Sequence, residues 1–251
     1  MLRSTMSVLR TEISPTLNDF EIAAAQTALM IIASAVQERG RCLLALSGGS
    51  TPQGAYRHLG DLLTSQLVEL SRIYLIFVDD RMVPPDHPES NYRMVHREFI
   101  SRLRGPGLHV YRIRGEAEPD IAAREYDREL QTVFELFSGR CDLMLLGVGT
   151  DGHTASLFPG TAVLRETARC VVAQYVEVMA TWRVTFTAPL INAARHVAFL
   201  AEGAGKAQML WNVLEGPYQP DVWPSQLIQP VNGELHWLVD AAAAAKVRAA
   251  G

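Results

Sequence analysis

The sequence predicts an α/β fold in which a Rossmann-like, mainly parallel sheet carries helices on both faces. Short apolar runs alternate with segments of helical periodicity along most of the chain. The apolar runs do not alternate with polar residues, which is typical of parallel strands buried on both faces. Strands and helices that alternate in this order build a parallel sheet covered on both sides.

The first half of the chain begins with a long helical pattern. Residues 19–39 carry apolar side chains at helical spacing and are followed by Gly40, a residue common just past a helix end. The runs 42–46 and 73–78 predict buried strands because they are short and apolar throughout. The same two patterns predict helices at 52–58, 91–103 and 120–137 and strands at 109–113 and 141–146.

The second half continues the alternation. Strands are expected at 169–174, 183–187, 196–201 and 236–239, and a helix at 205–214. Asp240 favours the N-cap position and predicts a closing helix through the alanines that follow it. Residues 216–230 form the most loop-like stretch, but strands are predicted on both sides of them. We therefore expect one α/β domain over residues 1–251.

The composition narrows the classes of protein. Of the 251 residues, 48% are hydrophobic and 20% charged, which suits a globular protein with a sizeable core. The formal net charge of −4 offers no basic surface to nucleic acid. No run of about 18 apolar residues and no signal-peptide pattern occurs, so we expect no membrane partner and a cytoplasmic protein. Cys42, Cys141 and Cys170 lie in apolar runs without zinc-site spacing, which predicts buried, reduced thiols.

The loop LSGGSTP follows the strand 42–46. Ligands of open α/β sheets bind beyond the carboxyl ends of strands. Gly48 and Gly49 let backbone N–H groups turn toward one point, Ser50 and Thr51 add hydroxyl donors, and the helix from Pro52 favours an anion at its N-terminus. No lysine follows the glycines, so this is not a nucleotide P-loop. The loop predicts a site for the phosphate of a small molecule, and the alternative is an ordinary strand-to-helix turn.

The segment VDDRMVPPDHPESNY follows the strand 73–78. Two carboxylates, Asp79 and Asp80, precede Arg81, whose guanidinium can pair with a carboxylate or meet negative charge that develops on a substrate. The alternative is a solvated loop in which Ser90 caps the next helix.

The segment GVGTDGHTASLFPG follows the strand 141–146 and contains the pattern G-x-G-x-x-G. A dinucleotide site also needs a helix in the loop and an acid about 20 residues on, but Pro159 and Gly160 stop the helix and no such acid follows. The glycines instead leave room for a substrate beside His153, which can accept a proton, and Asp151 can orient its ring. The alternative is a structural histidine.

A fourth segment, EGAGK, follows the strand 196–201. Lys206 lies in the first turn of the next helix, where a cation opposes the helix dipole, so a bound anion would explain it. A surface lysine is the alternative. Arg183, near the start of the strand 183–187, is a second candidate cation. Together the segments predict a small phosphorylated substrate, with its phosphate at the glycine loop and Lys206 and proton chemistry at His153 beside Arg81.

Five motifs in order resemble the 6-phosphogluconolactonases of the glucosamine-6-phosphate isomerase/6-phosphogluconolactonase family. They are LSGGSTP, VDDRMVPPDHPESNY, GVGTDGHTASLFPG, TFTAPLINAARHVAFLAEGAGKA and HWLVDAAAA. The resemblance implies the fold of sugar-phosphate isomerases and deaminases and an ester hydrolase that converts 6-phospho-D-glucono-1,5-lactone to 6-phospho-D-gluconate in the oxidative pentose phosphate pathway. It implies no cofactor and no metal. We expect a monomer or weak homo-oligomer whose partner is the phosphorylated lactone.

The resemblance also implies roles for single residues. His153 would activate water, Asp151 would orient it and Arg81 would stabilise charge on the lactone. The residues around the phosphate would be Ser47, Gly48, Gly49, Ser50, Thr51, Lys206 and Arg183, and those beside the sugar Asp79 and Gly149. Many members have Asp-Glu-Arg where this chain has Asp80 in the middle, which keeps the position acidic. No G-x-S-x-G nucleophile motif occurs, which suits attack by water on an activated ester.

Two other functions stay open. A deaminase-type isomerase acting on glucosamine 6-phosphate would share the phosphate loop, the Asp-Gly-His run and Lys206. Such enzymes usually carry Asp-Glu-Tyr in place of residues 79–81 and apolar-Asn-Glu-Pro in place of residues 156–159, which read Ser-Leu-Phe-Pro here. A non-catalytic sugar-phosphate sensor would keep the phosphate loop but would not need His153 and Arg81.

Overall fold

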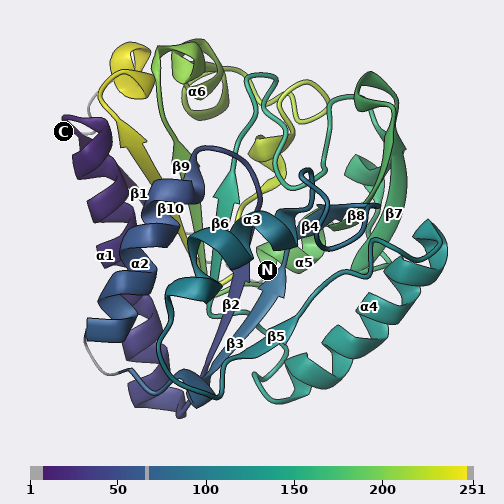
Figure 1. Cartoon of the computed structure of the whole chain (residues 1–251). Helices are drawn as coiled ribbons and strands as arrows, with labels where there is room; N and C mark the ends of the chain where they lie inside the picture. Colours follow the sequence, from purple (N-terminus) through teal and green to yellow (C-terminus); the bar gives the residue numbers. More distant parts are fainter. Residues whose placement is uncertain (1–7, 66–67, 248–251) are drawn as a thin grey trace, which may run out of the picture.

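A seven-stranded parallel sheet forms the centre of the molecule (Figure 1). The computed structural model describes residues 8–65 and 68–247, so both ends of the predicted domain lie outside the described residues. The strand order is β1-β10-β9-β6-β2-β3-β5. The strands are β1 (Val8–Ser14), β2 (Cys42–Leu46), β3 (Ile73–Phe77), β5 (His109–Tyr111), β6 (Leu143–Gly147), β9 (His196–Ala201) and β10 (Glu234–Asp240). The α/β class and the mainly parallel sheet are confirmed.

A second, antiparallel sheet corrects part of the prediction. It consists of β4 (Asp79–Arg81), β7 (Val171–Val176) and β8 (Thr181–Phe186) in the order β4-β8-β7. The strands predicted at 169–174 and 183–187 are present as β7 and β8, but they do not join the large sheet as a single-sheet fold requires. The connection between β7 and β8 is a 3-10 turn, Glu177–Met179, which is far too short for the crossover that parallel neighbours require.

The chain passes from the large sheet to the small one at Val78. Its N–H donates to the carbonyl of Leu46 at 3.1 Å, which continues the pairing of β3 with β2. Its carbonyl accepts a hydrogen bond of 2.8 Å from the N–H of Phe186, a residue of β8. The first three residues after Val78, Asp79–Arg81, therefore form strand β4 rather than a loop, and the small sheet is held against the carboxyl end of β3.

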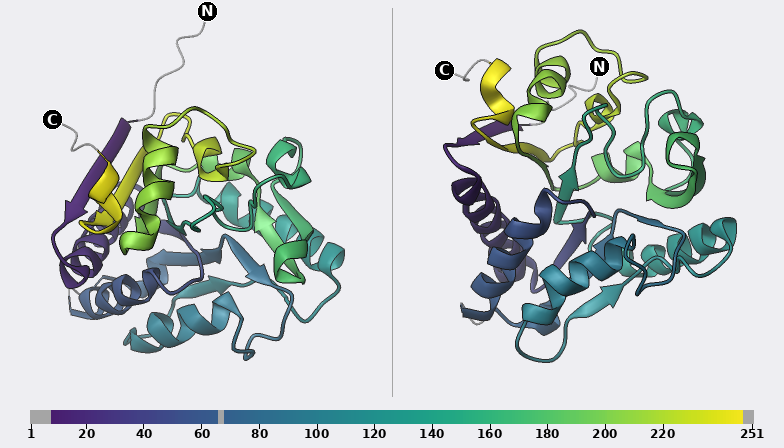
Figure 2. Two further views of the ribbon diagram at one scale, coloured as in Figure 1. Left: turned by 90° about the horizontal axis from the view of Figure 1, so that it is seen from above. Right: turned by 45° about the horizontal axis from the view of Figure 1, so that its top comes forward.

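Helices cover both faces of the large sheet, as predicted. They are α1 (Leu17–Arg39), α2 (Pro52–Ser65), α3 (Asn91–Glu98), α4 (Pro119–Glu135), α5 (Ala188–Asn192) and α6 (Ala207–Leu214). Helices α1, α2 and α3 lie side by side on one face, and α4 lies on the other with the small sheet (Figure 2). The expected closing helix is only a 3-10 turn, Ala243–Lys246, although the Asp240 carboxylate accepts from the N–H of Ala243 at 2.7 Å, as a cap does.

Helix α1 is long and apolar enough to cross a membrane by length and composition alone. The core helix of a soluble protein passes the same test, and α1 packs against α2 and the sheet. Its buried side chains are Phe20, Ala24, Ala25, Ala28, Leu29, Ile32 and Ala35. Cys42 and Cys141 are buried as expected, but Cys170 is exposed because it precedes the first residue of β7, an edge strand of the small sheet.

The strands that precede the four predicted site segments are neighbours. They occupy the consecutive positions β9-β6-β2-β3 in the large sheet. After β2 the chain continues to β3, its neighbour on one side, and after β6 it continues in this sheet to β9, which lies in the opposite direction. The connections therefore run in opposite directions from the gap between β2 and β6. Ligands of open α/β sheets bind at such a switch point, beyond the carboxyl ends of the strands.

Candidate functional site

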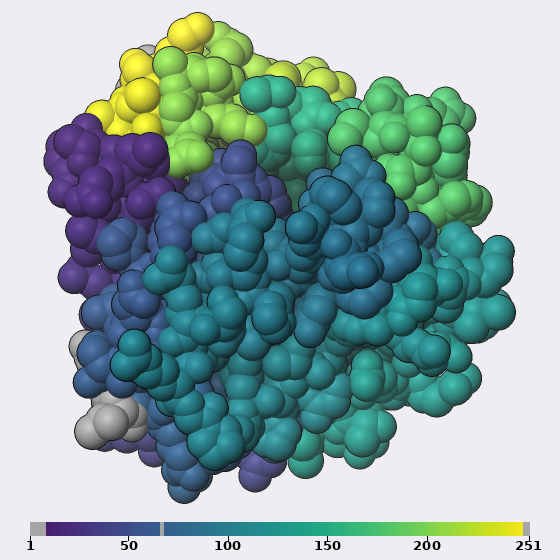
Figure 3. Space-filling model, in the orientation of Figure 1, coloured from purple at the N-terminus to yellow at the C-terminus, as the bar shows by residue number. Residues whose placement is uncertain are grey.

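A cavity of about 190 Å³ lies at this switch point. It is lined by Ser47, Gly48, Gly49, Ser50, Thr51, Pro52, Asp79, Arg81, Asn91, Gly147, Val148, Gly149, His153, Ala155, Arg183 and Lys206. The lining includes every residue predicted for the site except Asp151, which lies behind His153. Figure 3 shows that segments far apart in the sequence, coloured purple, blue and green, meet on this face of the molecule.

A histidine–aspartate pair stands in the loop after β6. The Nδ1 atom of His153 lies 2.6 Å from Oδ1 of Asp151, and the same oxygen accepts from the backbone N–H of His153 at 3.2 Å. Partial burial acts to raise the pKa of Asp151, but the hydrogen bond and charge of His153 lower it below its ordinary value. With Nδ1 bonded to a carboxylate, the Nε2 atom of His153 is the nitrogen left to accept a proton from a ligand or water.

The ring of His153 is fixed on two further sides. Phe158 stacks on it with ring centroids 4.2 Å apart and planes 19° from parallel. A Cβ atom on Gly149 would come within 2.1 Å of the His153 Nδ1 atom, so only glycine allows the ring this position. Gly149 was expected to leave room for a substrate, and in the structure it leaves room for the His153 ring. Phe158 was missed because nothing in its local pattern separates it from an ordinary apolar residue.

A larger cavity of about 650 Å³ lies on the far side of this loop. It is lined by Asp151 and Phe158, by residues of β7, among them Val172 and Val176, and by Val178 in the turn that follows. Its lining brings together fewer groups that could do chemistry than the smaller cavity, which holds the histidine ring and three cationic side chains. We therefore place the candidate site in the smaller cavity.

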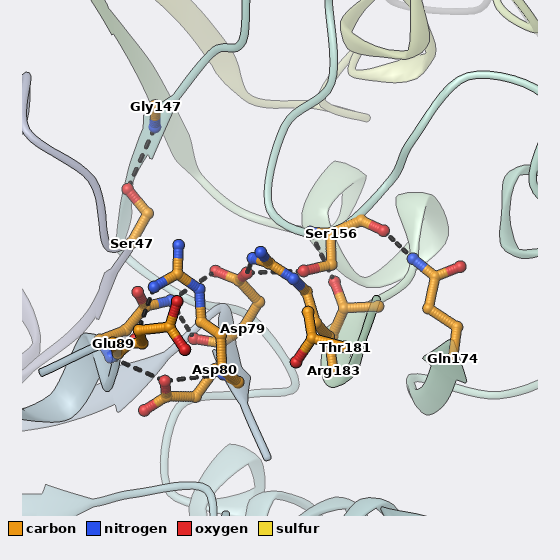
Figure 4. Close-up of polar contacts among 12 residues, drawn as sticks. Ser47, Asp79, Asp80, Glu89, Gly147, Ser156, Gln174, Thr181 and Arg183 are labelled. Carbon is orange, nitrogen blue, oxygen red and sulfur yellow. Dashed lines mark hydrogen bonds and ion pairs between the residues drawn. The ribbon is translucent and has the colours of Figure 1, made fainter. Parts of the chain in front are cut away.

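The loop after β2 is tied to the loop after β6. The Ser47 hydroxyl accepts from the N–H of Gly147 at 3.1 Å (Figure 4). A Cβ atom on Gly48 would lie 1.8 Å from Oδ1 of Asn91, so this glycine makes room for the Asn91 side chain. Asn91 in turn donates from Nδ2 to the carbonyl of Asp79 at 2.9 Å. Asn91 was not predicted as a site residue, because its place at the start of a helix already explained it.

Two arginines face each other across the small sheet. Arg81 on β4 and Arg183 on β8 are directly opposed partners in the antiparallel register. Like charges in such positions destabilise a sheet. The Nε atoms of both are buried and have no hydrogen-bond partner among the described residues. Unpaired donors on two adjacent cations are what an anionic ligand would satisfy.

Arg183 is the more deeply buried of the two, at 4% exposure. Burial lowers the pKa of its guanidinium, Asp79 opposes that shift and Arg81 adds to it. The nearest approach of its Nη1 atom to Oδ2 of Asp79 is 3.9 Å, which is a loose pair for a buried cation (Figure 4). The same Asp79 oxygen accepts a closer bond, from the Ser156 hydroxyl at 2.7 Å. Asp79 therefore leaves much of the Arg183 charge for a ligand.

Asp80 is structural rather than part of the cavity wall. Its carboxylate accepts from the N–H groups of Arg81, Asn91 and Tyr92 at 2.8, 2.7 and 3.0 Å. Burial raises the pKa of Asp80 to about 6, against the effect of these bonds. Ser90 caps α3 by accepting from the N–H of Arg93 at 3.2 Å, as the alternative for this segment predicted. The segment thus combines a helix cap with the site arginine.

Lys206 reaches the cavity from the start of α6. Its Nζ atom donates to the carbonyl of Val148 at 2.7 Å, which links the loop after β9 to the loop after β6. Burial lowers the pKa of Lys206, although the charges of Asp151 and Glu202 oppose this. The lysine occupies the N-cap position of α6, one residue before the first turn in which it was predicted.

The same fold and motifs occur in known proteins. Residues 15–237 match the family described as glucosamine-6-phosphate isomerases/6-phosphogluconolactonase. The 6-phosphogluconolactonase of Synechocystis sp. is 38% identical over 221 residues, which cover 86% of this chain and 89% of that protein. The 6-phosphogluconolactonase of Homo sapiens is 40% identical over 224 residues, 88% of this chain and 85% of that one.

A solved structure agrees with these relatives. The 6-phosphogluconolactonase from Trypanosoma brucei superposes with a TM-score of 0.82 at 26% sequence identity, covering 97% of this chain and 100% of that one. By sequence and by fold, the chain belongs to the glucosamine-6-phosphate isomerase/6-phosphogluconolactonase family.

Proposed function

We propose that the protein hydrolyses 6-phospho-D-glucono-1,5-lactone to 6-phospho-D-gluconate, the second step of the oxidative pentose phosphate pathway. The observation that carries this proposal is one cavity lined by His153, which is paired with Asp151, and by three cations, Arg81, Arg183 and Lys206. Relatives named 6-phosphogluconolactonase, 38% and 40% identical over most of their length, support the same activity.

His153 is the general base of the proposed reaction. Its Nε2 atom takes a proton from water, and the water oxygen forms a bond to the lactone carbonyl carbon. Asp151 holds the opposite nitrogen, fixes the tautomer and stabilises the imidazolium that forms. When the tetrahedral intermediate collapses, the bond from the carbonyl carbon to the ring oxygen breaks, and His153 returns the proton to that oxygen. The product is the open-chain acid.

The cations hold the negative charges of the substrate. Lys206 and the N–H groups and hydroxyls of residues 47–51 surround the phosphate at the start of α2, where the helix dipole also favours an anion. Arg81 stabilises the oxyanion. Arg183 lies beside Arg81 and adds the positive potential that the phosphate requires. Asp79 and Gly149 line the remaining wall, next to the sugar.

Phe158 separates this proposal from a deaminase-type isomerase. Its ring stacks on His153 in the segment where such isomerases usually carry a glutamate that supports ring opening. A sensor that only binds sugar phosphates has no use for a histidine held in one tautomer by an aspartate. Both features favour hydrolysis.

The direct test generates the lactone in situ from glucose 6-phosphate and follows acid release above the spontaneous rate. The expected result is rapid hydrolysis that is lost in His153→Ala. Ammonia release from glucosamine 6-phosphate would support the isomerase instead. Binding of 6-phosphogluconate without turnover of the lactone would support the sensor.

We further propose a cytoplasmic monomer or weak homo-oligomer. The three free cysteines suit a reducing compartment. Sedimentation of the purified protein at several concentrations measures the state of assembly.

A further inference from the structure

A second cluster of ligand-type side chains lies at the opposite end of the large sheet. His196 is the first residue of β9, and Glu234 and His236 belong to the start of the neighbouring β10. The strand β9 rises about 16 Å from this end to the carboxyl end that carries the candidate site. One ligand atom from each of the three side chains lies within 4.8 Å of the other two.

We propose that His196, Glu234 and His236 bind a zinc ion. Zinc in proteins is held tetrahedrally with Zn–N bonds of about 2.0–2.1 Å, which sets neighbouring nitrogen ligands roughly 3.3–3.4 Å apart. The Nδ1 atom of His196 lies 3.3 Å from the Nε2 atom of His236. That nitrogen of His236 lies 3.6 Å from Oε2 of Glu234. The ligand atoms of His196 and Glu234 lie within 4.8 Å of each other, so an ion bound by all three would draw these two side chains closer together.

The chemistry of the three groups matches the metal. Two imidazoles and one carboxylate are a known zinc ligand set, which leaves a fourth position for water. A ligand imidazole must be neutral to bind the ion. A cavity of about 380 Å³ next to α1 gives an ion access to all three side chains.

Arg10 would compete with zinc for the Glu234 carboxylate. Its Nε atom lies 3.0 Å from the same Glu234 oxygen, Oε2, that would bind zinc. The arginine side chain is 62% exposed on β1, so it can move away without disturbing the core. Without zinc, the two histidines share a hydrogen bond and Arg10 pairs with Glu234. Removal of the arginine charge should therefore tighten zinc binding.

The experiment titrates the tag-free protein with Zn²⁺ against a chromophoric chelator. The expected result is one site per chain, with a Kd that rises by more than about tenfold in His196→Gln and in Glu234→Gln. Both substituted side chains are partly exposed, so the variants should fold. His58→Gln is the matched control. Nε2 of His58 lies 3.8 Å from Glu21, but among the described residues this pair belongs to no group of three ligand-type side chains. The Kd of this variant for zinc should not change.

Arg10→Gln tests the proposal in the opposite direction. It should lower the Kd for zinc several-fold, and Co²⁺ bound to this variant should show the intense visible absorption of a four-coordinate site. Titration in a His153→Ala background removes the candidate catalytic histidine as a ligand and should leave the Kd unchanged. Zinc affinity that is lost with His153, or that is indifferent to His196, Glu234 and Arg10, would overturn the proposal.

Discussion

At the scale of the residue, one imidazole carries the proposed chemistry. His153→Ala should lower kcat by roughly 10²–10⁴-fold, because a positioned base contributes about that much. Asp151→Asn should also lower kcat, since the amide no longer fixes the tautomer, while KM changes little. Steady-state kinetics corrected for spontaneous hydrolysis measures both. A folded His153→Ala protein within a few-fold of the wild-type rate would show that the base lies elsewhere, first at Asp79.

The wild-type rate adds a second measurement for His153. Protonation of the ring removes its ability to accept a proton from water. The enzymatic rate should therefore fall toward acidic pH, and the residual rate of His153→Ala should not follow that profile. Spontaneous lactone hydrolysis speeds up with pH and must be subtracted at each point.

A lysine offers a matched pair of variants. The chain has only two lysines, Lys206 in the candidate site and Lys246, which bonds Gln208 on the surface. Lys206→Ala should weaken substrate binding by about 1.5–3 kcal/mol, the usual value of a hydrogen bond to a charged group, and mostly raise KM. Lys246→Ala should leave KM unchanged. Equal KM values for the two variants would remove Lys206 from the phosphate site.

The spacing role of Gly149 can be isolated in the same way. Its Cβ would lie 2.1 Å from the His153 ring, so Gly149→Ala should displace the imidazole and lower kcat about as much as loss of the base, roughly 10²-fold or more. Gly205 has open space around it, and Gly205→Ala should be close to wild type. A fully active Gly149→Ala protein would mean that the loop tolerates a different ring position.

At the scale of the element, Asp80 joins β4 to the start of α3 and predicts how stability changes with pH. Its pKa is raised in the folded protein from 3.8 to about 6, so the fold holds its proton more tightly than the unfolded chain does. Its contribution to the free energy of unfolding is therefore greatest below about pH 4 and falls by roughly 3 kcal/mol as pH rises to about 6.

Urea unfolding of the wild type and of Asp80→Asn at a series of pH values measures this contribution. The variant has no carboxyl to titrate at this position, so the wild type should lose stability relative to it as pH rises from about 4 to about 6. A difference between the two proteins that stays constant with pH, or that changes in the opposite direction, would contradict the prediction.

The elements differ in how far the sequence predicts them. Strands β2 and β9 were predicted to the residue because β2 is buried and apolar throughout and β9 is so from its second residue onward. Strand β1 was missed because it is an edge strand with several exposed side chains and no continuous apolar run. The small sheet was misassigned because β4 has only three polar residues, whose pairing depends on β8, about a hundred residues away.

The residues that line the candidate cavity were named from the sequence more completely than the fold that brings them together. Glycines, His153 and Lys206 could be found because each follows an apolar run, where parallel strands place ligands. The opposition of Arg81 and Arg183 depends on an antiparallel register that local pattern does not contain. The zinc candidate histidines were missed because they acquire their partners only through tertiary contacts, and Asn91 because its position at the start of α3 already explained it.

At the scale of the whole molecule, four neighbouring strands and the small sheet converge on one charged cavity. A bound anion should therefore stabilise the entire fold. The product 6-phosphogluconate at 100 times its Kd should add about 2.7 kcal/mol, which for a chain of this size raises Tm by roughly 5–10 °C. In the Arg183→Gln variant, the rise in Tm on ligand addition should fall by more than half. Arg165→Gln is the control, because Arg165 is exposed and pairs with Asp221, and its rise in Tm should equal that of the wild type. Equal shifts in both variants would place the anion away from Arg183.

The opposed arginines also bear on how the protein moves before substrate arrives. Repulsion between Arg81 and Arg183 weakens β4 and β8 where they pair, while the large sheet beneath them carries no such penalty. Without ligand, local unfolding should therefore occur first in the small sheet. The free energy of this local unfolding should be well below that of global unfolding. In the proposed function, the substrate phosphate neutralises part of this repulsion, so ligand binding should also make β4 and β8 more rigid.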